Sequence, residues 1–326
     1  MLKVRQVAGA AVLLAVALGG RAEELIVVEK GAERLAGYDT ATGRALWSVP
    51  VGTKPHEFAI SRDGKTAWVS NYGVDSYADK GAGGNTLSVV DLVRHEPLGT
   101  IELGEIRRPH FIHVGASGRL YVTTDEPAGL VVIDPATRAV VRHYPVGQAL
   151  PHMLAVSADE KRAFTANTGS GTVSVIALDT DTPVRQVEIG GLPQGFAWSR
   201  DGKRLFVSNR AGDAVLALDP ATGEVAGRTT ITGHPHRLCL VPDGRRLLAT
   251  AIDSGDVILI DTGSLREVTR FRVGKRADGV TVDAAGQFGY VAVQDEDKVV
   301  KFSIAEWKPV LEIRTRAKPD PVGVLK

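Results

Sequence analysis

The stretch Leu150-Pro151-His152-Met153-Leu154-Ala155-Val156-Ser157 recurs along the chain and decides its fold. From the second copy onward, the recurrence has a constant period of 42 residues. A fixed period of this length indicates a repeat architecture. We call the residue that follows the proline, or the residue aligned with it, the marker residue of each copy; the seven marker residues are His56, His110, His152, Gln194, His236, Asp278 and Asp320.

Each copy predicts four strands. Apolar side chains stand two and four positions after the marker residue, as Leu154 and Val156 do, and this alternation indicates a strand. An Asp-Gly turn such as Asp201-Gly202 follows, and it favours a hairpin into a second strand at 205–209. Segments such as 172–178 and 225–231 predict the third and fourth strands. Four antiparallel strands per repeat are typical of a propeller blade.

The two ends of the chain complete one another in this pattern. Six full repeats start at the marker residues from His56 to Asp278. Segments 26–28, 36–39 and 45–51 predict the second to fourth strands of one more blade, and 320–325 predicts its first strand. The sequence therefore predicts an all-β, seven-bladed β-propeller whose last blade is closed by the N- and C-terminal strands. Such closure leaves no open sheet edge.

Residues 1–22 differ from the rest of the chain. A short basic start, Met1-Leu2-Lys3-Val4-Arg5, precedes an apolar run at 7–18 and the small residues Gly20 and Ala22. This organisation predicts a secretory signal peptide at 1–22, followed by a single propeller domain at 23–326. The apolar run is too short for a good membrane span, so we expect no transmembrane span after its removal. An uncleaved anchor is the alternative. The expected location is the periplasm or the medium.

Charge and cysteine content exclude several function classes. The formal net charge is +1, and it becomes −2 once Lys3, Arg5 and Arg21 are removed with the signal peptide. A near-neutral body predicts no nucleic-acid partner. The only cysteine, Cys239, permits no internal disulfide, and its slot holds small residues in most other copies, so we expect a small buried side chain.

The second and third strands carry a family resemblance. The segments Trp68-Val69-Ser70-Asn71, Phe206-Val207-Ser208-Asn209 and Thr172-Val173-Ser174-Val175-Ile176 are similar to the repeat of the YVTN-repeat (YncE-like) propellers of secreted bacterial proteins. The resemblance covers 23–326 and implies a seven-bladed propeller. It implies no particular reaction, because propellers host unrelated chemistries. The family repeat has no preference for histidine at the marker position, so the histidines here are a departure from it.

The marker residues predict a polar ring. The first strand of a blade is innermost, so its start should lie at one mouth of the central channel. Neutral imidazole is a common ligand of Zn, Cu and Ni. We therefore predict a site for a divalent transition metal (Cu, Zn or Ni) with the ligands His56, His110, His152, His236, Asp278 and Asp320. The alternative is that duplication copied a Pro-His turn whose imidazoles only bind neighbouring loops.

A second ring should lie beside the first. The second strands end at the same face, and their last residues are polar on one arc. The first unit also carries ten extra residues within 71–85, where glycines accompany Tyr72 and Tyr77, and we interpret this insertion either as a partial lid or as a tolerated surface loop. The predicted ligand-binding residues are Glu29, Asn71, Tyr72, Asn167, Gln194 and Asn209.

These features favour a monomeric binding or accessory protein that presents its mouth to a metal ion, a small ligand or a partner protein. No Gly-x-Ser-x-Gly elbow, Walker loop, dinucleotide fingerprint or CxxCH motif is present. The alternative is an enzyme, either a metal-dependent hydrolase or lactonase or a copper-dependent oxidoreductase, working at the same mouth. An extracellular structural module is a third possibility, supported only by the expected secretion.

Overall fold

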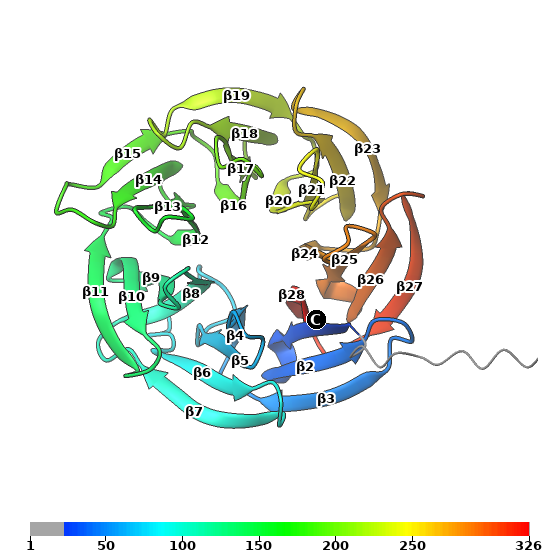
Figure 1. Ribbon diagram of the computed structural model, residues 1–326, viewed down its shortest axis with the longest axis horizontal. Helices are drawn as coiled ribbons and strands as arrows, with labels where there is room; N and C mark the ends of the chain where they lie inside the picture. Colours follow the sequence, from blue (N-terminus) through cyan, green and yellow to red (C-terminus); the bar gives the residue numbers. More distant parts are fainter. Residues whose placement is uncertain (1–22, 326) are drawn as a thin grey trace, which may run out of the picture.

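The computed structural model describes residues 23–325 and shows seven four-stranded antiparallel sheets arranged around one axis (Figure 1). The predicted signal peptide and Lys326 lie outside the described residues. Within 23–325 the only helical segments are two short 3₁₀ turns, η1 (Lys30–Ala32) and η2 (Gln294–Glu296), and neither is long or apolar enough to cross a membrane. The prediction of a seven-bladed propeller with four strands per blade is confirmed.

We number the blades by their inner strands, which surround the axis in Figure 1. Blade 1 contains β4 (Pro55–Ile60), β5 (Thr66–Asn71), β6 (Thr86–Asp91) and β7 (Glu96–Glu102). Blade 2 contains β8 (Arg107–Val114), β9 (Leu120–Glu126), β10 (Ala128–Asp134) and β11 (Ala139–Pro145). Blade 3 contains β12 (Pro151–Val156), β13 (Arg162–Asn167), β14 (Thr172–Ala177) and β15 (Arg185–Glu188).

The next three blades repeat this order. Blade 4 contains β16 (Pro193–Trp198), β17 (Leu205–Asn209), β18 (Ala214–Leu218) and β19 (Val225–Thr230). Blade 5 contains β20 (Pro235–Leu240), β21 (Arg246–Ala251), β22 (Asp256–Asp261) and β23 (Arg266–Arg272). Blade 6 contains β24 (Ala277–Val282), β25 (Phe288–Val293), β26 (Lys298–Ser303) and β27 (Lys308–Arg314).

Blade 7 joins the two ends of the chain. Its inner strand is β28 (Pro319–Leu325), which pairs antiparallel with β1 (Glu24–Glu29), followed by β2 (Arg34–Asp39) and β3 (Ala45–Pro50). The register sets Leu25 opposite Val324 and Val27 opposite Val322. The predicted closure is confirmed, and it removes the free edge that an open ring would present.

The hydrophobic core lies between neighbouring blades rather than inside any one of them. One cluster joins Trp68 and Leu87 of blade 1 to Ile112 and Val122 of blade 2, and similar clusters recur around the ring. Alternation along each strand produces this arrangement, because both faces of a blade are covered by the adjacent blades. Cys239 packs partly buried between blades 5 and 6, where burial raises the pKa of its thiol to about 12.

Candidate functional site

The marker residues stand where the ladder of each inner strand is interrupted. In all seven blades the register between the first and second strands shifts at this point, for example between Pro55 and Phe58 in blade 1. A bulge of this kind adds a residue to one strand and re-aims the side chains beside it. All seven marker residues line one cavity, so the convergence that the repeat predicts is present despite the bulge.

A hydroxyl group fills each of several bulges. In blade 1, Ser70 Oγ accepts a hydrogen bond from the Glu57 backbone N–H at 2.9 Å and donates to the His110 carbonyl oxygen of blade 2 at 2.6 Å. Thr123 and Ser208 make the same two contacts in their own blades. In these three blades the hydroxyl of the second strand satisfies a bulged N–H and ties the blade to the inner strand of the next one.

Four imidazoles converge at this end of the axis. The ring centroids of His56 and His110 lie 4.1 Å apart, those of His110 and His152 lie 3.9 Å apart, and those of His152 and His236 lie 6.1 Å apart. Three of the four are buried, and the His56 side chain keeps 14% of its surface exposed. The ring that the repeat predicted is therefore brought together by the fold.

The carboxylates among the marker residues lie against these imidazoles. Asp320 Oδ2 is 3.3 Å from His56 Nδ1, and Asp278 Oδ1 is 3.3 Å from His236 Nε2. Gln194 is also buried in the ring. Together these residues line a cavity of about 90 Å³, which we call the ring cavity.

Three further charged residues, Arg237, Glu57 and Lys30, belong to the site and were not anticipated. Arg237, in blade 5, forms ion pairs with Glu57 in blade 1, with Asp278 at 3.4 Å and with Asp320 at 3.7 Å. Lys30 Nζ lies 3.9 Å from Asp320 Oδ2. Glu57 and Arg237 each follow a marker residue directly, and the bulge gives them access to the ring. A signal was present in the sequence, because they are the only charged residues at this position and have opposite signs.

Burial controls the protonation of the ring. It holds the pKa values of His56, His110 and His152 well below the usual imidazole range, and it lowers the pKa of His236 despite the opposing effect of Asp278. The imidazoles are thus neutral at pH 7, the form that binds metals.

The carboxyl groups respond to burial in the opposite direction. Burial raises the pKa of Glu57 to about 6, although Arg237 opposes the shift. Burial and then the charge of Asp278 raise the pKa of Asp320 well above its usual value. Burial would also raise the pKa of Asp278, but His236 and Arg237 outweigh it and hold that pKa well below the usual range. Asp75, Arg210 and Arg276 also line the cavity, so the ionised acids and the cations around it balance in number.

Several buried donor and acceptor atoms in the ring have no hydrogen-bond partner. Among residues 23–325 they include Nδ1 of all four ring histidines, Oε1 of Gln194 and Oδ1 of Asp320. Ligand atoms of His56, Glu57 and Asp320 all lie within 4.8 Å of one another. Buried polar atoms are normally paired, so a group of unpaired ones around a cavity points to a ligand.

The structure places some of the other predicted site residues at the ring cavity and others away from it. Tyr72 lines the ring cavity, with its ring edge-on to His56 at 5.4 Å and to His110 at 5.5 Å between centroids. Its hydroxyl donates to Asp125 Oδ2 at 2.5 Å. Burial raises the pKa of both groups, to about 6 for Asp125.

The asparagines of the second ring bind within their own blades instead of lining the ring cavity. Asn71 Oδ1 accepts from the Gly52 backbone N–H at 3.1 Å, and Asn167 Nδ2 donates to Thr172 Oγ1 at 2.9 Å. Asn209 Oδ1 accepts two backbone N–H groups, and the Glu29 carboxylate accepts from the Tyr38 hydroxyl and the Arg316 N–H. The register places each of these residues opposite the proline that precedes a marker residue, as predicted, but their polar atoms stabilise loops.

The insertion in blade 1 reaches over the ring cavity. Its residues Asp75, Ser76 and Tyr77 line that cavity. Asp75 Oδ1 pairs with Lys54 Nζ at 3.0 Å, and the buried Arg108 donates from Nη2 to the Asp79 carbonyl oxygen at 2.7 Å. The insertion is therefore held in place by hydrogen bonds and an ion pair.

Comparison with known proteins agrees with this architecture. The chain is 31% identical over 150 residues to the seven-bladed beta-propeller protein Rv1057 of Mycobacterium tuberculosis. The match covers 44% of this chain and 35% of that protein, so the chain spans about a third of the relative's length. The solved structure of hydrazine synthase from Kuenenia stuttgartiensis superposes with a TM-score of 0.75 at 20% identity, covering 86% of this chain and 92% of that one.

The periplasmic gluconolactonase PpgL of Pseudomonas aeruginosa superposes with a TM-score of 0.73 at 18% identity, covering 93% of this chain and 99% of that one. Structural likeness at such low identity shows the fold alone. Residues 99–287, more than half of the chain, match the YNCE-like beta-propeller family. The chain therefore belongs to the YNCE-like β-propeller family.

Proposed function

We propose that this protein is a periplasmic or secreted binding or accessory propeller that holds one divalent transition metal ion in the ring cavity. The observation that carries the proposal is the set of four ring imidazoles whose buried Nδ1 atoms lack hydrogen-bond partners, beside the carboxylates of Glu57 and Asp320. Nitrogen and carboxylate ligands together suit Zn(II), Cu(II) or Ni(II) better than Mg(II), which prefers oxygen.

The carboxyl groups of the cavity also favour a cation. Burial raises the pKa values of Glu57 and Asp320, so it opposes their ionisation in the empty site. A bound metal would favour the ionised carboxylates, and it would displace the protons that these carboxyls otherwise hold.

The size of the cavity argues for an ion rather than an organic substrate. A volume of about 90 Å³ accommodates an ion with one or two water molecules, given about 30 Å³ per water in the liquid. Pockets for organic ligands usually have volumes of about 300 to 1,000 Å³. The core ligands in this proposal are His56, Glu57 and Asp320, with His110 the nearest further imidazole.

A metal-dependent hydrolase or lactonase at the same mouth is the second candidate. The feature that favours it is the buried Asp320, whose raised pKa and whose Oδ1 without a hydrogen bond would suit a proton-transfer group. A copper-dependent oxidoreductase would use the same imidazoles. Turnover of lactones, or of a dye-coupled redox substrate, by the metal-loaded protein but not by the metal-free protein would favour these enzymes over a binding protein.

Metal titration tests the proposal. Calorimetry on chelator-treated protein at pH 7.5 should show one equivalent of Zn(II) or Cu(II) bound, and no binding of Mg(II). His56→Ala/His110→Ala should weaken binding by at least about 100-fold, because even outer partners of metal ligands contribute 10- to 100-fold. His143→Ala, on the outer strand β11, is the matched control and should bind as wild type does. Equal weak binding by all three proteins would overturn the proposal and leave the ring histidines as inherited turn residues.

The location is tested separately. Residues 1–22 have the composition of a secretory signal, and fractionation of cells expressing the full chain should place the protein outside the cytoplasm with a mass reduced by these residues. Retention in the cytoplasm at full mass would contradict this part of the proposal without affecting metal binding.

A further inference from the structure

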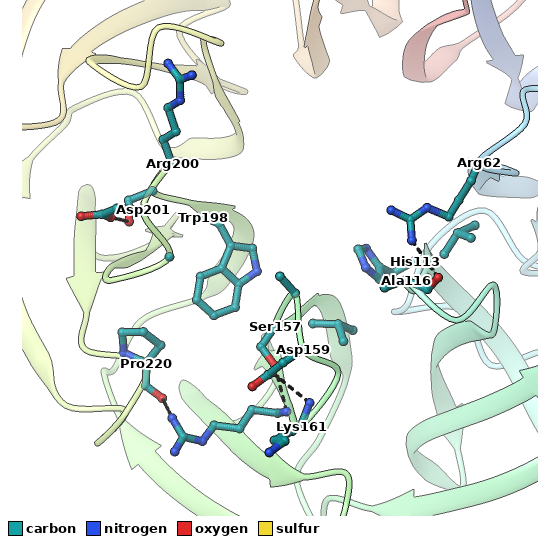
Figure 2. Close-up of a pocket in the computed structure, with 16 residues that line it drawn as sticks. Arg62, His113, Ala116, Ser157, Asp159, Lys161, Trp198, Arg200, Asp201 and Pro220 are labelled. Carbon is teal, nitrogen blue, oxygen red and sulfur yellow. Dashed lines mark hydrogen bonds between the residues drawn. The ribbon is translucent and has the colours of Figure 1, made fainter.

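A second and larger cavity lies at the opposite ends of the inner strands. The ring cavity is lined by residues at the starts of these strands, whereas the second cavity, of about 870 Å³, is lined by residues at or beyond their ends, such as Val114, Val156 and Trp198 (Figure 2). It spans blades 1 to 4. Its volume falls within the usual range for sites that bind small organic molecules.

Two of the residues that line this cavity break the repeat. Three positions after the marker residue, blade 2 has His113, whereas the other blades have small residues there: Ala59, Ala155, Ala197, Cys239, Thr281 and Gly323. Four positions after the marker residue, blade 4 has Trp198, whereas the other blades have aliphatic residues: Ile60, Val114, Val156, Leu240, Val282 and Val324. The other six blades show what packing alone requires at each position. Both exceptions line the same cavity.

Trp198 offers both an apolar surface and an unused donor. Its indole ring packs edge-on against Phe164 at 5.7 Å between centroids, and the remainder lines the cavity (Figure 2). Its Nε1–H is buried without a hydrogen-bond partner among the described residues. A buried indole N–H usually finds a partner, so this one lacks an acceptor that a ligand could supply.

The rim of the second cavity is cationic. It contains Arg62, Lys161, Arg162 and Arg200 against two acids, Asp159 and Asp201. Both carboxylates accept hydrogen bonds within their own turns. Asp159 Oδ1 accepts from Ser157 Oγ at 2.6 Å, and Asp201 Oδ1 accepts from Ser199 Oγ at 2.7 Å. Arg62 uses Nη1 to bind the Ala116 carbonyl oxygen at 2.7 Å and keeps its other nitrogens for further contacts (Figure 2).

We propose that the second cavity binds a small organic anion with a flat apolar body, which lies against Trp198 while its carboxylate or phosphate group faces the cationic rim. The aromatic surface of Trp198 suits the planar body of the ligand. The guanidinium and ammonium groups of the rim form charge-assisted hydrogen bonds with its anionic group. This site is separate from the proposed metal site, and neither requires the other.

The proposal is tested with 2-naphthoate, using 2-naphthamide and 2-(aminomethyl)naphthalene as its neutral and cationic counterparts. By calorimetry, 2-naphthoate should bind in one equivalent and at least about tenfold more tightly than the amide, with the amine weakest. Trp198→Leu and the exposed Arg62→Gln/Lys161→Gln variant should each weaken binding of 2-naphthoate by at least about fivefold. The matched control Lys203→Gln, on the same turn as Asp201 but outside the lining, should bind as wild type does.

Several results would overturn the proposal. One is equal affinity for the three naphthalenes, which would indicate nonspecific apolar binding; another is no measurable binding of 2-naphthoate at millimolar concentration. Wild-type affinity in the Arg62→Gln/Lys161→Gln variant, whose substitutions leave the core untouched, would also exclude it. The His56→Ala/His110→Ala variant should bind 2-naphthoate normally, so failure of the metal proposal and failure of this one are distinguishable.

Discussion

The guanidinium of Arg237 in blade 5 forms a buried ion pair with the carboxylate of Glu57 in blade 1, which lies 180 residues away in sequence. Both side chains follow a marker residue, and both are almost fully excluded from solvent. The pair therefore connects opposite parts of the ring across the propeller axis. Arg237 also forms ion pairs with Asp278 and Asp320.

Removing that cation should destabilise the protein. Arg237→Met removes the cation that Glu57, Asp278 and Asp320 share, and breaking a buried pair from one side costs about 3–5 kcal/mol. Urea unfolding monitored by tryptophan fluorescence at pH 7.5 measures the loss. Arg94→Met, which removes an exposed arginine paired with Glu96, is the control and should change the free energy of unfolding by less than about 0.5 kcal/mol. A loss below 1 kcal/mol in Arg237→Met would mean that the pair contributes little.

Stability should fall as the solution is acidified below the ordinary histidine pKa. The ring histidines have pKa values below 6.5 in the folded state, so below pH 6.5 the unfolded chain binds more protons and the free energy of unfolding decreases. Glu57 and Asp320, whose pKa values are raised, act in the opposite direction above the unfolded carboxyl pKa, near 4.5 for Glu57, so they soften the decrease. Urea titrations at pH 7.5 and 5.5 measure the difference.

The histidine contribution is isolated by substitution. His110→Gln/His152→Gln should show a smaller decrease in stability between pH 7.5 and 5.5 than wild type, because two of the groups that take up protons on unfolding are gone. His143→Gln, on the outer strand β11, removes one half-buried histidine whose pKa burial lowers less than those of the ring, so it should keep most of the wild-type slope. An identical pH dependence in wild type and the ring variant would show that other groups dominate.

Closure of the ring by β28 gives a truncation test. Deleting Pro319–Lys326 removes the inner strand of blade 7, exposing the Leu25 and Val27 face of β1, and also removes Asp320 from the ring. We expect a cooperative loss of several kcal/mol, since a whole buried strand is lost. Differential scanning calorimetry measures it. A truncated protein that melts at the wild-type temperature would contradict closure by the two termini.

The insertion in blade 1 can be deleted between Gly73 and Gly84, because the backbones of these two residues lie close together. A Cβ built on Gly73 would come within 1.9 Å of the Gly84 backbone nitrogen, so the two glycines touch and the ten residues between them can be removed with little distortion. The deletion leaves Arg108 without the carbonyl acceptors of Asp79 and Gly81, which should cost about 1–3 kcal/mol.

The same deletion tests the lid. Because Asp75, Ser76 and Tyr77 line the ring cavity, metal release to a chelator should be faster in the deletion variant than in wild type by stopped-flow absorbance. Lys54→Gln, which removes only the ion pair with Asp75, should give an intermediate rate. If release is unchanged while stability falls, the insertion is packed structure and does not gate the cavity.

The sequence by itself determined the propeller and the position of its polar ring. The period of 42 residues, the alternation after each marker residue and the complementary strands at the two ends require seven blades with the marker residues at one end of the axis. These conclusions depend on local patterns repeated many times. A departure in one copy, such as Gln194 in place of histidine, does not hide a pattern that the other copies repeat.

Tertiary structure alone decided which charged residues join the marker residues in the ring and where a second cavity lies. Period-two alternation assumes a regular ladder, and the bulge at each inner strand adds a residue that brings Glu57 and Arg237 to the ring. Asn167 and Asn209 end their strands at the predicted place, but nearby hydroxyl and backbone groups take their hydrogen bonds. The cavity beside His113 and Trp198 arises from several blades at once. Contacts between residues so distant in sequence leave no periodic signal, because each depends on how the blades close into a ring.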